Sequence, residues 1–452
     1  MLYDAESGDF NLGLLGDVML TRGIAQFREP AFVALRDLLI KNDAVFANLE
    51  GSVRRADEGA PGITVGTYMT TAPELLDDIK GMGIGIVSCA NNHAYDYGEA
   101  GLLATIAHLD AARIAHAGSG ANLAEARAPA YVDTPRGRLA LVAATSTYRP
   151  WNRAAPQRPD MRGRPGVNPL GFKTSYQVDA AALAQLRAIS ERLGFAKAAK
   201  RDSGHFFSPR ELGAGAAGVK LAGQSFVEGD DFAIRRGLDQ ADLDDNLRWI
   251  RDARRQADFV LASIHSHEAG ARNLLTAETK GDLSEPAEIN RAFAHAAIDA
   301  GADAVAGHGF HTILGIELYK GRPIFHGLGN FIFMNESVRA FPAEAYERFD
   351  LGPDATPADF LDARTNGGKK GHPADPLFWQ SAAVTCHWRG GALREIRLYP
   401  VDLGHGLVRA QRGRPVLADA AKAQSILERL DRLSQSFGTK ISRDGDCGVI
   451  RL

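Results

Sequence analysis

Short apolar runs alternate with helical patterns through the first third of the chain, and this alternation restricts the possible folds more than any other feature. Alternation of this kind is typical of an α/β sheet covered by helices. The runs that predict strands are "LGLLGD" (12–17), "AVFANLE" (44–50), "IGIVSCA" (84–90) and "RLALVAAT" (138–145). The segments that predict helices are 31–41, 72–83 and 98–112.

Two polar segments rich in glycine and proline interrupt the alternation, at about 148–235 and 335–376. The first contains one helical pattern near 180–193 and is otherwise weakly patterned. We therefore expect a single domain, residues 1–452, with two long insertions near its active edge. The other predicted elements are helices at 242–256, 286–301 and 418–433, strands at 258–265, 302–308, 312–320 and 322–329, and a hairpin at 381–401.

Composition and charge limit which partners and which cellular location we expect for the protein. With 45% apolar and 24% charged residues, the chain can bury a sizeable core. Its net charge of -3 gives no electrostatic reason to expect nucleic acid or an anionic membrane as a partner. No apolar run reaches the roughly 18 residues of a membrane helix, and the acidic start does not resemble a secretory signal, so we expect a cytoplasmic protein. The three cysteines have no metal-type spacing and predict no structural disulfide.

Polar residues that suit chemistry gather where the predicted strands end. In α/β sheets the carboxyl ends of several strands meet at one crevice, so we expect these side chains to lie together. They are Asp17 after the first strand, Glu50 after the second, Asn91, Asn92 and His93 after the third, His265 and His267 in "IHSHE", and His308 and His311 in "GHGFH".

These side chains offer oxygen and imidazole ligands without a thiolate, a set that suits zinc, manganese or iron. Two ions that share a carboxylate can activate water for hydrolysis. Taken singly, each motif has a plainer interpretation: "GD" as a turn, "NNH" as a capped turn, His265 as a core histidine. The ordered set favours a site for one or two divalent ions.

Four stretches also resemble a known family. They are "GDVMLTRG" (16–23), "FANLEGSV" (46–53), "SCANNHAYDYGEAGL" (88–102) and "GHGFHTILGIELYKGRPIFHGLGNFIF" (307–333). They are similar to the capsule-synthesis CapA family, which is associated with poly-γ-glutamate formation and belongs to the calcineurin-like metallophosphoesterase superfamily. The resemblance implies a four-layer α/β/β/α sandwich of two mixed sheets.

The resemblance also implies roles for individual residues. Glu50 takes the place of the superfamily's bridging aspartate, and His93 that of the histidine that contacts the scissile group. The other implied metal ligands are Asp17, Asn92, His265, His308 and His311.

The chain departs from the superfamily pattern in places. Met19 stands where the first motif has a histidine, and two residues rather than one separate His308 from His311. The fourth motif of the CapA family has a glycine and a glutamate where this chain has His267 and Ala269. His267 is therefore the candidate for a substitute ligand, and the number of bound ions stays open.

Other residues have two interpretations each. Arg149 and Arg153 belong to an arginine-rich loop (148–166) that either clamps an anionic substrate or is simply solvated. Asp96 either holds His93 by a hydrogen bond or caps the helix that begins at Gly98. Asn91 and Asn330 are candidate substrate contacts, although Asn330 equally fits a turn. His372 belongs to no constellation in the sequence.

The sequence thus predicts a metal-dependent hydrolase that uses metal-activated water, with His93 and Asp96 as catalytic groups. We expect an acidic substrate, either a γ-glutamyl amide or peptide-like compound or a phosphoester. The alternative is a non-catalytic polymer-binding or assembly component of capsule synthesis, which the missing histidine at position 19 favours. The substrate, the metal and the oligomeric state stay open.

Overall fold

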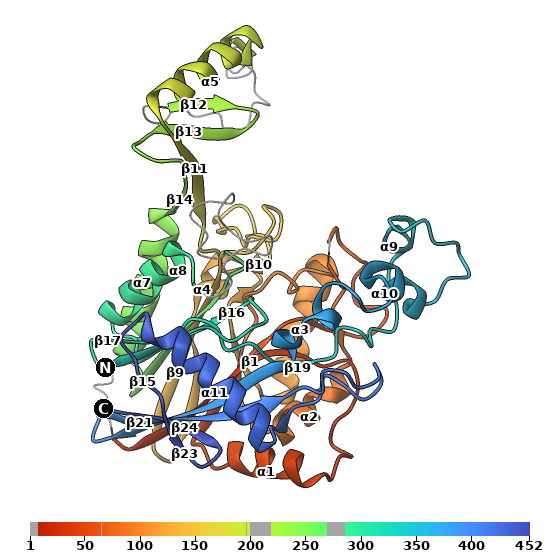
Figure 1. Cartoon of the computed structure of the whole chain (residues 1–452), viewed down its shortest axis with the longest axis vertical. Helices are drawn as coiled ribbons and strands as arrows, with labels where there is room; N and C mark the ends of the chain where they lie inside the picture. The colour runs from red at the N-terminus through yellow and green to blue at the C-terminus, as the bar shows by residue number, and fades with distance from the viewer. Residues whose placement is uncertain (1–7, 65, 196, 199–217, 269–284) are drawn as a thin grey trace.

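The computed structural model describes residues 8–64, 66–195, 197–198, 218–268 and 285–452, and it is a mixed α/β structure (Figure 1). The α/β class expected from the sequence is confirmed. Ala269, which the sequence pattern places at the position of a family glutamate, lies outside the described residues.

The larger sheet has ten strands, with β1 (Phe10–Met19) near its centre. β1 runs parallel to β2 (Ala44–Leu49) and to the short β19 (Asn330–Phe333), and antiparallel to β20 (Gln380–Arg389). The other strands are β5 (Ile86–Ser88) and β6 (Ala115–Ala117) beyond β2, and β21 (Ala392–Asp402), β22 (Val416–Leu417), β23 (Ser442–Asp444) and β24 (Cys447–Arg451) beyond β20.

The smaller sheet has six strands in the order β17, β18, β16, β15, β9, β8. Its central strands β9 (Gly137–Thr145), β15 (Phe259–His265), β16 (Ala304–His308) and β18 (Arg322–Phe325) are parallel, and the edge strands β8 (Ala130–Thr134) and β17 (Ile316–Tyr319) are antiparallel to their neighbours. Two-stranded pairs form between β3 (Ser52–Val53) and β4 (Thr70–Thr71), and between β7 (Ser119–Gly120) and β10 (Gly166–Val167).

The two large sheets share one apolar core. Leu12, Leu14 and Phe46 of the ten-stranded sheet belong to the same buried cluster as Leu141 and Leu261 of the six-stranded sheet. The rings of Phe10 and Phe259 stack across this core with centroids 4.4 Å apart. Helix α11 (Ala420–Gln435) adds Ile426, Leu427 and Leu430 to it.

Helices cover the outer faces of both sheets. The ten-stranded sheet is covered by α1 (Pro30–Leu39), α2 (Leu76–Gly81) and α3 (Gly98–Ala112), which contribute Phe32, Leu76 and Leu109 to a second core. The six-stranded sheet is covered by α7 (Gln240–Arg254) and α8 (Glu288–Asp299), which contribute Ile250 and Phe293 to a third. The shorter helices are α4 (Leu123–Arg127), η1 (Pro73–Leu75), η3 (His372–Ala374) and η4 (Pro376–Trp379).

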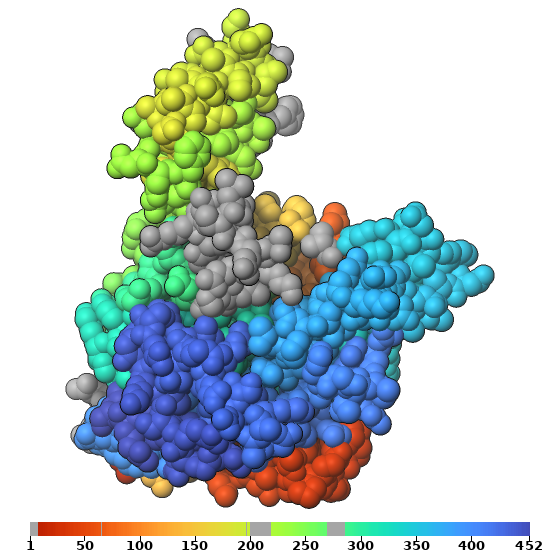
Figure 2. Space-filling model, viewed as in Figure 1, coloured from red at the N-terminus to blue at the C-terminus, as the bar shows by residue number. Residues whose placement is uncertain are grey.

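Two parts of the chain project from this body (Figures 1 and 2). The first is a four-stranded sheet of β11 (Phe172–Val178), β12 (Gly218–Leu221), β13 (Gln224–Glu228) and β14 (Ala233–Leu238) with α5 (Ala180–Arg192) against it. The second carries α9 (Ala343–Glu347) and α10 (Pro357–Thr365). The first has only a small buried core of Val178, Leu183 and Val219. Its strands are therefore half-exposed and leave little apolar signal, which explains why the sequence showed only a weak pattern there.

Two strand predictions need correction. The strand expected at 312–320 begins only at Ile316, because Ile313 makes an isolated bridge to Leu328 instead of joining a ladder. Strand β19 was not predicted: it has four residues, directly follows Gly329, and gains its partner only by lying beside β1.

Gly16 lies where β1 touches the turn before β19. A Cβ atom at this position would lie 2.0 Å from the carbonyl oxygen of Gly329, which also accepts a hydrogen bond from the Asp17 amide at 2.9 Å. We expect Gly16→Ala to lower the free energy of unfolding by about 3 kcal/mol or more, since overpacked backbone cannot move aside cheaply. Gly85→Ala, with no atom within 4 Å of its added Cβ, is the matched control. Equal urea midpoints for the two variants would contradict the expectation.

Candidate metal centre

The polar strand ends of both sheets meet at one place. Asp17 pairs in register with Asn48 of β2 and Asn330 of β19, and His265 pairs with His308. All five residues are buried. Parallel pairing thus brings the two sheets' carboxyl ends together, as expected from the order of the motifs.

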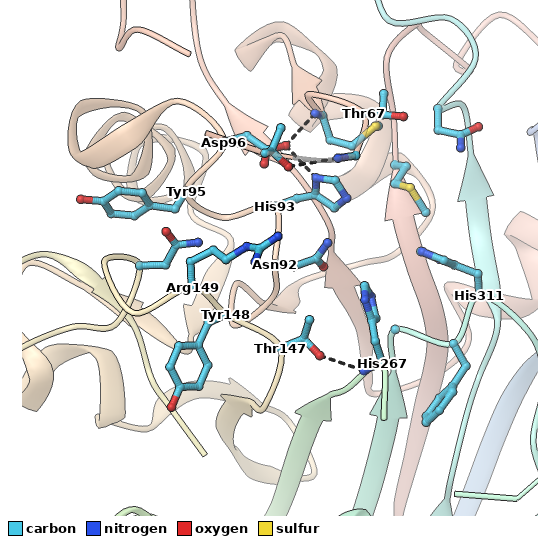
Figure 3. Close-up of a pocket in the computed structure, with 18 of the residues that line it drawn as sticks. Thr67, Asn92, His93, Tyr95, Asp96, Thr147, Tyr148, Arg149, His267 and His311 are labelled. Carbon is cyan, nitrogen blue, oxygen red and sulfur yellow. Dashed lines mark hydrogen bonds and ion pairs between the residues drawn. The ribbon is translucent and has the colours of Figure 1, made fainter. Parts of the chain in front are cut away.

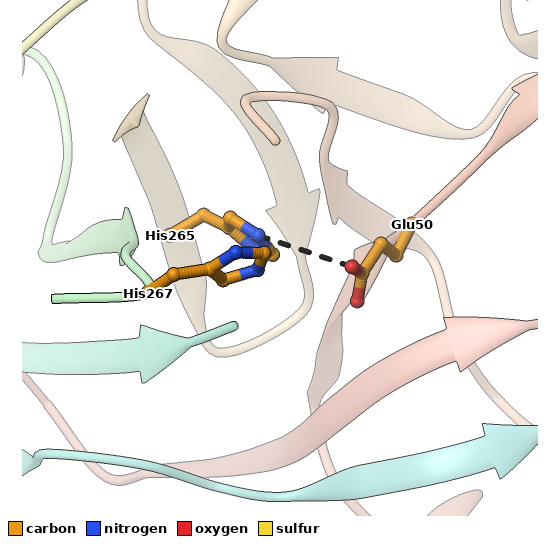
Figure 4. A group of neighbouring side chains, drawn as sticks. All are labelled: Glu50, His265 and His267. Carbon is orange, nitrogen blue, oxygen red and sulfur yellow. Dashed lines mark ion pairs between the residues drawn. The ribbon is translucent and has the colours of Figure 1, made fainter. Parts of the chain in front are cut away.

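Glu50 lies at the middle of this cluster. Its Oε1 atom is 3.8 Å from His93 Nε2, 3.9 Å from His265 Nε2 and 3.8 Å from His311 Nε2. Figure 4 shows the rings of His265 and His267 directed toward this carboxylate. Both carboxylate oxygens are buried, and neither makes a hydrogen bond of normal geometry with any residue that the structure describes.

Asp17 organises the other side of the cluster. Its Oδ1 atom is 3.3 Å from His308 Nδ1, and its Oδ2 atom is 3.4 Å from His311 Nδ1. Together with Glu50, Asp17 and His311 form a group whose ligand atoms lie within 4.8 Å of one another, and Glu50, His265 and His267 form a second such group. Glu50 belongs to both groups.

These separations fit metal coordination better than hydrogen bonding. Two atoms bound to one ion at about 2.1 Å lie roughly 3 to 3.5 Å apart, close to the separations around Asp17 and slightly below those around Glu50. A buried carboxylate without a hydrogen bond is costly unless a cation compensates it. The cluster therefore fits one or two divalent ions, with Glu50 able to contact both.

The pKa values in the cluster reflect crowded charges. Burial, helped by the charge of Asp17, raises the pKa of Glu50 to about 7. Burial opposes protonation of His311, but the charges of Glu50 and Asp17 outweigh it and raise the pKa of His311 to about 9. The cluster thus holds close carboxylates that favour a nearby positive charge.

Asn48 is a member of the site that sequence reasoning missed. Its Nδ2 atom donates to Asp17 Oδ1 at 2.9 Å and to His265 Nδ1 at 3.2 Å, which joins the two sheets. Because Asn48 is the polar residue of an otherwise apolar strand and lies two positions before Glu50, strand periodicity could have placed it on the same face.

Replacing Asn48 by alanine should weaken metal binding. The change leaves Asp17 and His265 without the amide that orients them, and loss of such an outer contact typically costs 10- to 100-fold in metal affinity, so we expect about that decrease. Competition with a fluorescent chelator would measure it. Asn42→Ala, at a position remote from the cluster, is the control, and unchanged affinity in Asn48→Ala would reject the assigned role.

Asn91 and Asn330 contact the candidate ligands and neighbouring backbone, and neither faces the cavity. Asn91 Nδ2 donates to the Leu49 carbonyl at 2.8 Å, and its Oδ1 accepts from the His93 amide at 3.1 Å. Asn330 Oδ1 accepts from His311 Nδ1 at 2.9 Å, which leaves the Nε2 atom of His311 toward Glu50. Neither asparagine lines the cavity described below, so the geometry favours positioning over the substrate contact that the sequence suggested.

His93 and Asp96 form a buried pair. His93 Nδ1 donates to Asp96 Oδ2 at 2.6 Å, and the same oxygen accepts from the Met69 amide at 2.9 Å. Burial opposes protonation of His93, but Asp96 outweighs it and raises the pKa of His93. Of the two interpretations of Asp96, the bond to His93 is present, and helix α3 has Tyr97, not Asp96, as its N-cap residue.

A cavity of about 810 Å³ opens onto the cluster (Figure 3). The cavity lining nearest the cluster consists of Asn92, His93, His267 and His311. Asn92 also contacts the cluster, because its Oδ1 atom accepts a hydrogen bond from His265 Nε2 at 2.8 Å. Arg149 lines the wall and directs its guanidinium toward Asn92 (Figure 3). The other lining residues include Tyr95, Asp96, Ser146, Tyr148, Glu268, Arg364 and His372.

The structure places Arg153 and His372 differently from what the sequence suggested. Arg153 does not line the cavity; its guanidinium pairs with the buried Asp242 at 2.7 Å and so holds its own loop in place. His372, which had no company in the sequence, lies with its ring centroid 5.3 Å from that of His311. The segment 335–376 brings it there from outside the strand pattern, so no local signal marked it.

The family model described as "Bacterial capsule synthesis protein PGA_cap" matches residues 11–335, more than half of the chain. The chain belongs to this family. The resemblance to the capsule-synthesis CapA family is confirmed by this match and by the relatives named below. The matched range includes all the candidate metal ligands.

Three relatives are similar to this PGA_cap chain, and two of them are named for PGA or polyglutamine synthesis. The uncharacterized protein y4uA of Sinorhizobium fredii is 36% identical over 453 residues, 98% of this chain and 93% of that protein. The PGA biosynthesis protein CapA of Bacillus subtilis is 35% identical over 121 residues, 26% of this chain and 29% of that protein. The probable polyglutamine synthesis accessory protein Rv0574c of Mycobacterium tuberculosis is 26% identical over 299 residues, 66% and 57% of the two chains.

Among the described residues of this PGA_cap chain, no helix has the length and apolar character needed to cross a membrane.

Proposed function

We propose that this chain is a metal-dependent hydrolase that acts on an acidic substrate, a γ-glutamyl amide or peptide-like compound or a phosphoester. The observation that carries the proposal is the Glu50 carboxylate, which is buried and shared by two groups of potential ligands beneath an open cavity. The four-layer α/β/β/α fold of the metallophosphoesterase superfamily belongs to the same proposal, and the packing of helices on the outer faces of two sheets supports it.

Each residue set would have its own task. Asp17, Glu50, His308 and His311 would hold one ion, and Glu50, Asn92, His265 and His267 a second; manganese, zinc and iron suit these ligands. A bound ion of this kind lowers the pKa of water and polarises the group that is attacked. His93, held by Asp96 with its Nε2 atom toward Glu50, would donate a proton to the leaving group. Arg149 would bind the substrate's charge.

A second candidate is a non-catalytic binding component of capsule or polyglutamate synthesis. Met19 lines the cavity at the position where a histidine ligand was expected, which favours weaker metal binding. The names of the Bacillus and Mycobacterium relatives favour a role beside a synthetic machinery. In this case the cavity would bind polymer without cleaving it.

Elemental analysis followed by an activity screen tests the proposal. Protein purified without chelators should contain one or two equivalents of a transition metal. With Mn²⁺, Zn²⁺ or Fe²⁺ added, it should hydrolyse an aryl phosphate or a γ-glutamyl peptide, and dialysis against EDTA should abolish that activity. Metal binding without turnover on either substrate class would reject the hydrolase and support the binding component.

A further inference from the structure

Arg364 reaches the cavity from outside the predicted strand pattern. It lies near the end of α10, and its Nη1 atom donates to Thr67 Oγ1 at 2.6 Å. Thr67 is buried, and both residues line the cavity. In Figure 3, Thr67 and Arg149 lie on opposite sides of His93. Arg149 and Thr67, the hydrogen-bond partner of Arg364, therefore line different sides of the cavity around His93.

Among the residues that the structure describes, no carboxylate lies within 4.0 Å of the Arg364 guanidinium, and none of the ion pairs involves this residue. Burial, together with the charge of Arg348, lowers the pKa of Arg364, so the charge is partly withdrawn from water. Elsewhere in this chain, the largely buried guanidinium of Arg412 is compensated by an ion pair with the buried Glu336. Within the described segments, no carboxylate compensates Arg364 in this way.

The carboxylates that line the cavity are already engaged. Asp96 accepts hydrogen bonds from His93 and from the Met69 amide. Glu268 accepts from Ser146 at 2.5 Å and from Ser266 at 2.7 Å. Neither is arranged to neutralise Arg364. A half-buried cation that opens onto a cavity and has no carboxylate partner among the described residues favours an anion supplied from outside.

We propose that Arg364 and Thr67 form a subsite for a carboxylate of the substrate, apart from the metal centre. The inference rests on the proposed function, because it takes the cavity to be the substrate site. A guanidinium has five N–H donors, and Thr67 uses one of them. The edge formed by Nε and Nη2 remains for a carboxylate, whose two oxygens match two parallel N–H groups. Arg364 is then a specificity-determining residue.

Calorimetric titration of the full chain tests the subsite without requiring turnover. The probes are γ-L-glutamyl-L-glutamate and γ-L-glutamyl-L-glutamine, which differ in one carboxylate. Wild-type protein should bind the first about tenfold more tightly, as expected for one charge-assisted bidentate contact. Arg364→Gln should remove that preference, and Arg364→Lys should keep part of it. Arg339→Gln, an exposed arginine of the same segment that does not line the cavity, should behave as wild type.

Several outcomes would overturn the subsite. They are a wild type that binds the two peptides equally or not at all, an Arg364→Gln variant that keeps the preference, or an Arg339→Gln variant that loses it. Inorganic phosphate should bind with the same affinity to wild-type protein and to Arg364→Gln. A lower phosphate affinity in Arg364→Gln would show that the subsite binds phosphate and not a carboxylate. Binding preference without hydrolysis would reject the proposed catalytic function and keep the subsite, so the two failures are distinguishable.

Discussion

A Glu50→Gln variant should contain no more than background divalent metal and should lose turnover by about 1,000-fold or more, because a bound ion supplies several kcal/mol of transition-state stabilisation. Glu50 is the one carboxylate that belongs to both groups of candidate ligands, so the substitution removes a ligand from each. Glutamine keeps the size of the side chain, and the cavity should stay intact. Elemental analysis and a hydrolysis assay would measure the two effects.

Although Glu50→Gln should lose metal and activity, we expect it to be more stable than wild type when metal is absent. Burial raises the pKa of Glu50 to about 7, so above that pH the metal-free wild-type protein must bury a charged carboxylate whose oxygens make no hydrogen bond of normal geometry with the described residues. A neutral amide avoids that cost, so Glu50→Gln in EDTA should unfold at a higher temperature than wild type in EDTA. Glu74→Gln, at an exposed position, should change neither quantity. A Glu50→Gln protein that retains its metal would reject the shared-ligand assignment.

A His93→Gln variant should lower kcat by about 100- to 10,000-fold, the range for loss of a general acid. Its metal content should stay near that of wild type, because His93 belongs to neither group of candidate ligands. Asp96→Asn should lower kcat by less, since the asparagine can still hold the ring but cannot favour its protonated form as a carboxylate does. The basic limb of the pH profile, where activity falls as His93 loses its proton, should move to lower pH in Asp96→Asn, because the Asp96 carboxylate raises the pKa of His93.

The control for this pair is another histidine and aspartate of the same chain. His116 Nε2 donates to Asp110 at 3.1 Å, and neither residue lines the cavity. His116→Gln should leave kcat, metal content and the pH profile unchanged. If His93→Gln lost its metal along with its activity, His93 would be a ligand and not the proton donor.

The convergence of the site was predictable, because it follows from parallel strands. Glu50, His265 and His308 stand at or just after strand ends, Asp17 lies near the end of β1, and Asn92 lies in the segment that follows β5. Parallel neighbours bring such ends to one edge. The sequence could also indicate the chemistry, since carboxylate, amide and imidazole groups without thiolates restrict the metals. Whether these groups catalyse stays a prediction.

The walls of the cavity could not be predicted in the same way. Arg364 and His372 come from the segment 335–376, where neither strand nor helix periodicity connects a residue to the site. Arg153 was a candidate substrate contact but does not reach the cavity, because its guanidinium forms an ion pair with the buried Asp242. Contacts of this kind depend on tertiary packing between remote segments, which local pattern does not encode.

Because the candidate ligands come from both sheets, an ion at Glu50 would link two halves that are otherwise held by apolar contact and by polar contacts such as the hydrogen bond from Asn48 to His265. Opening the sandwich at that edge would then require release of the ion. Amide hydrogens of β2 and β15 near their carboxyl ends should exchange more slowly in the loaded protein, while those at the opposite ends of the same strands keep their rates. The cofactor would thus govern how readily the two sheets part.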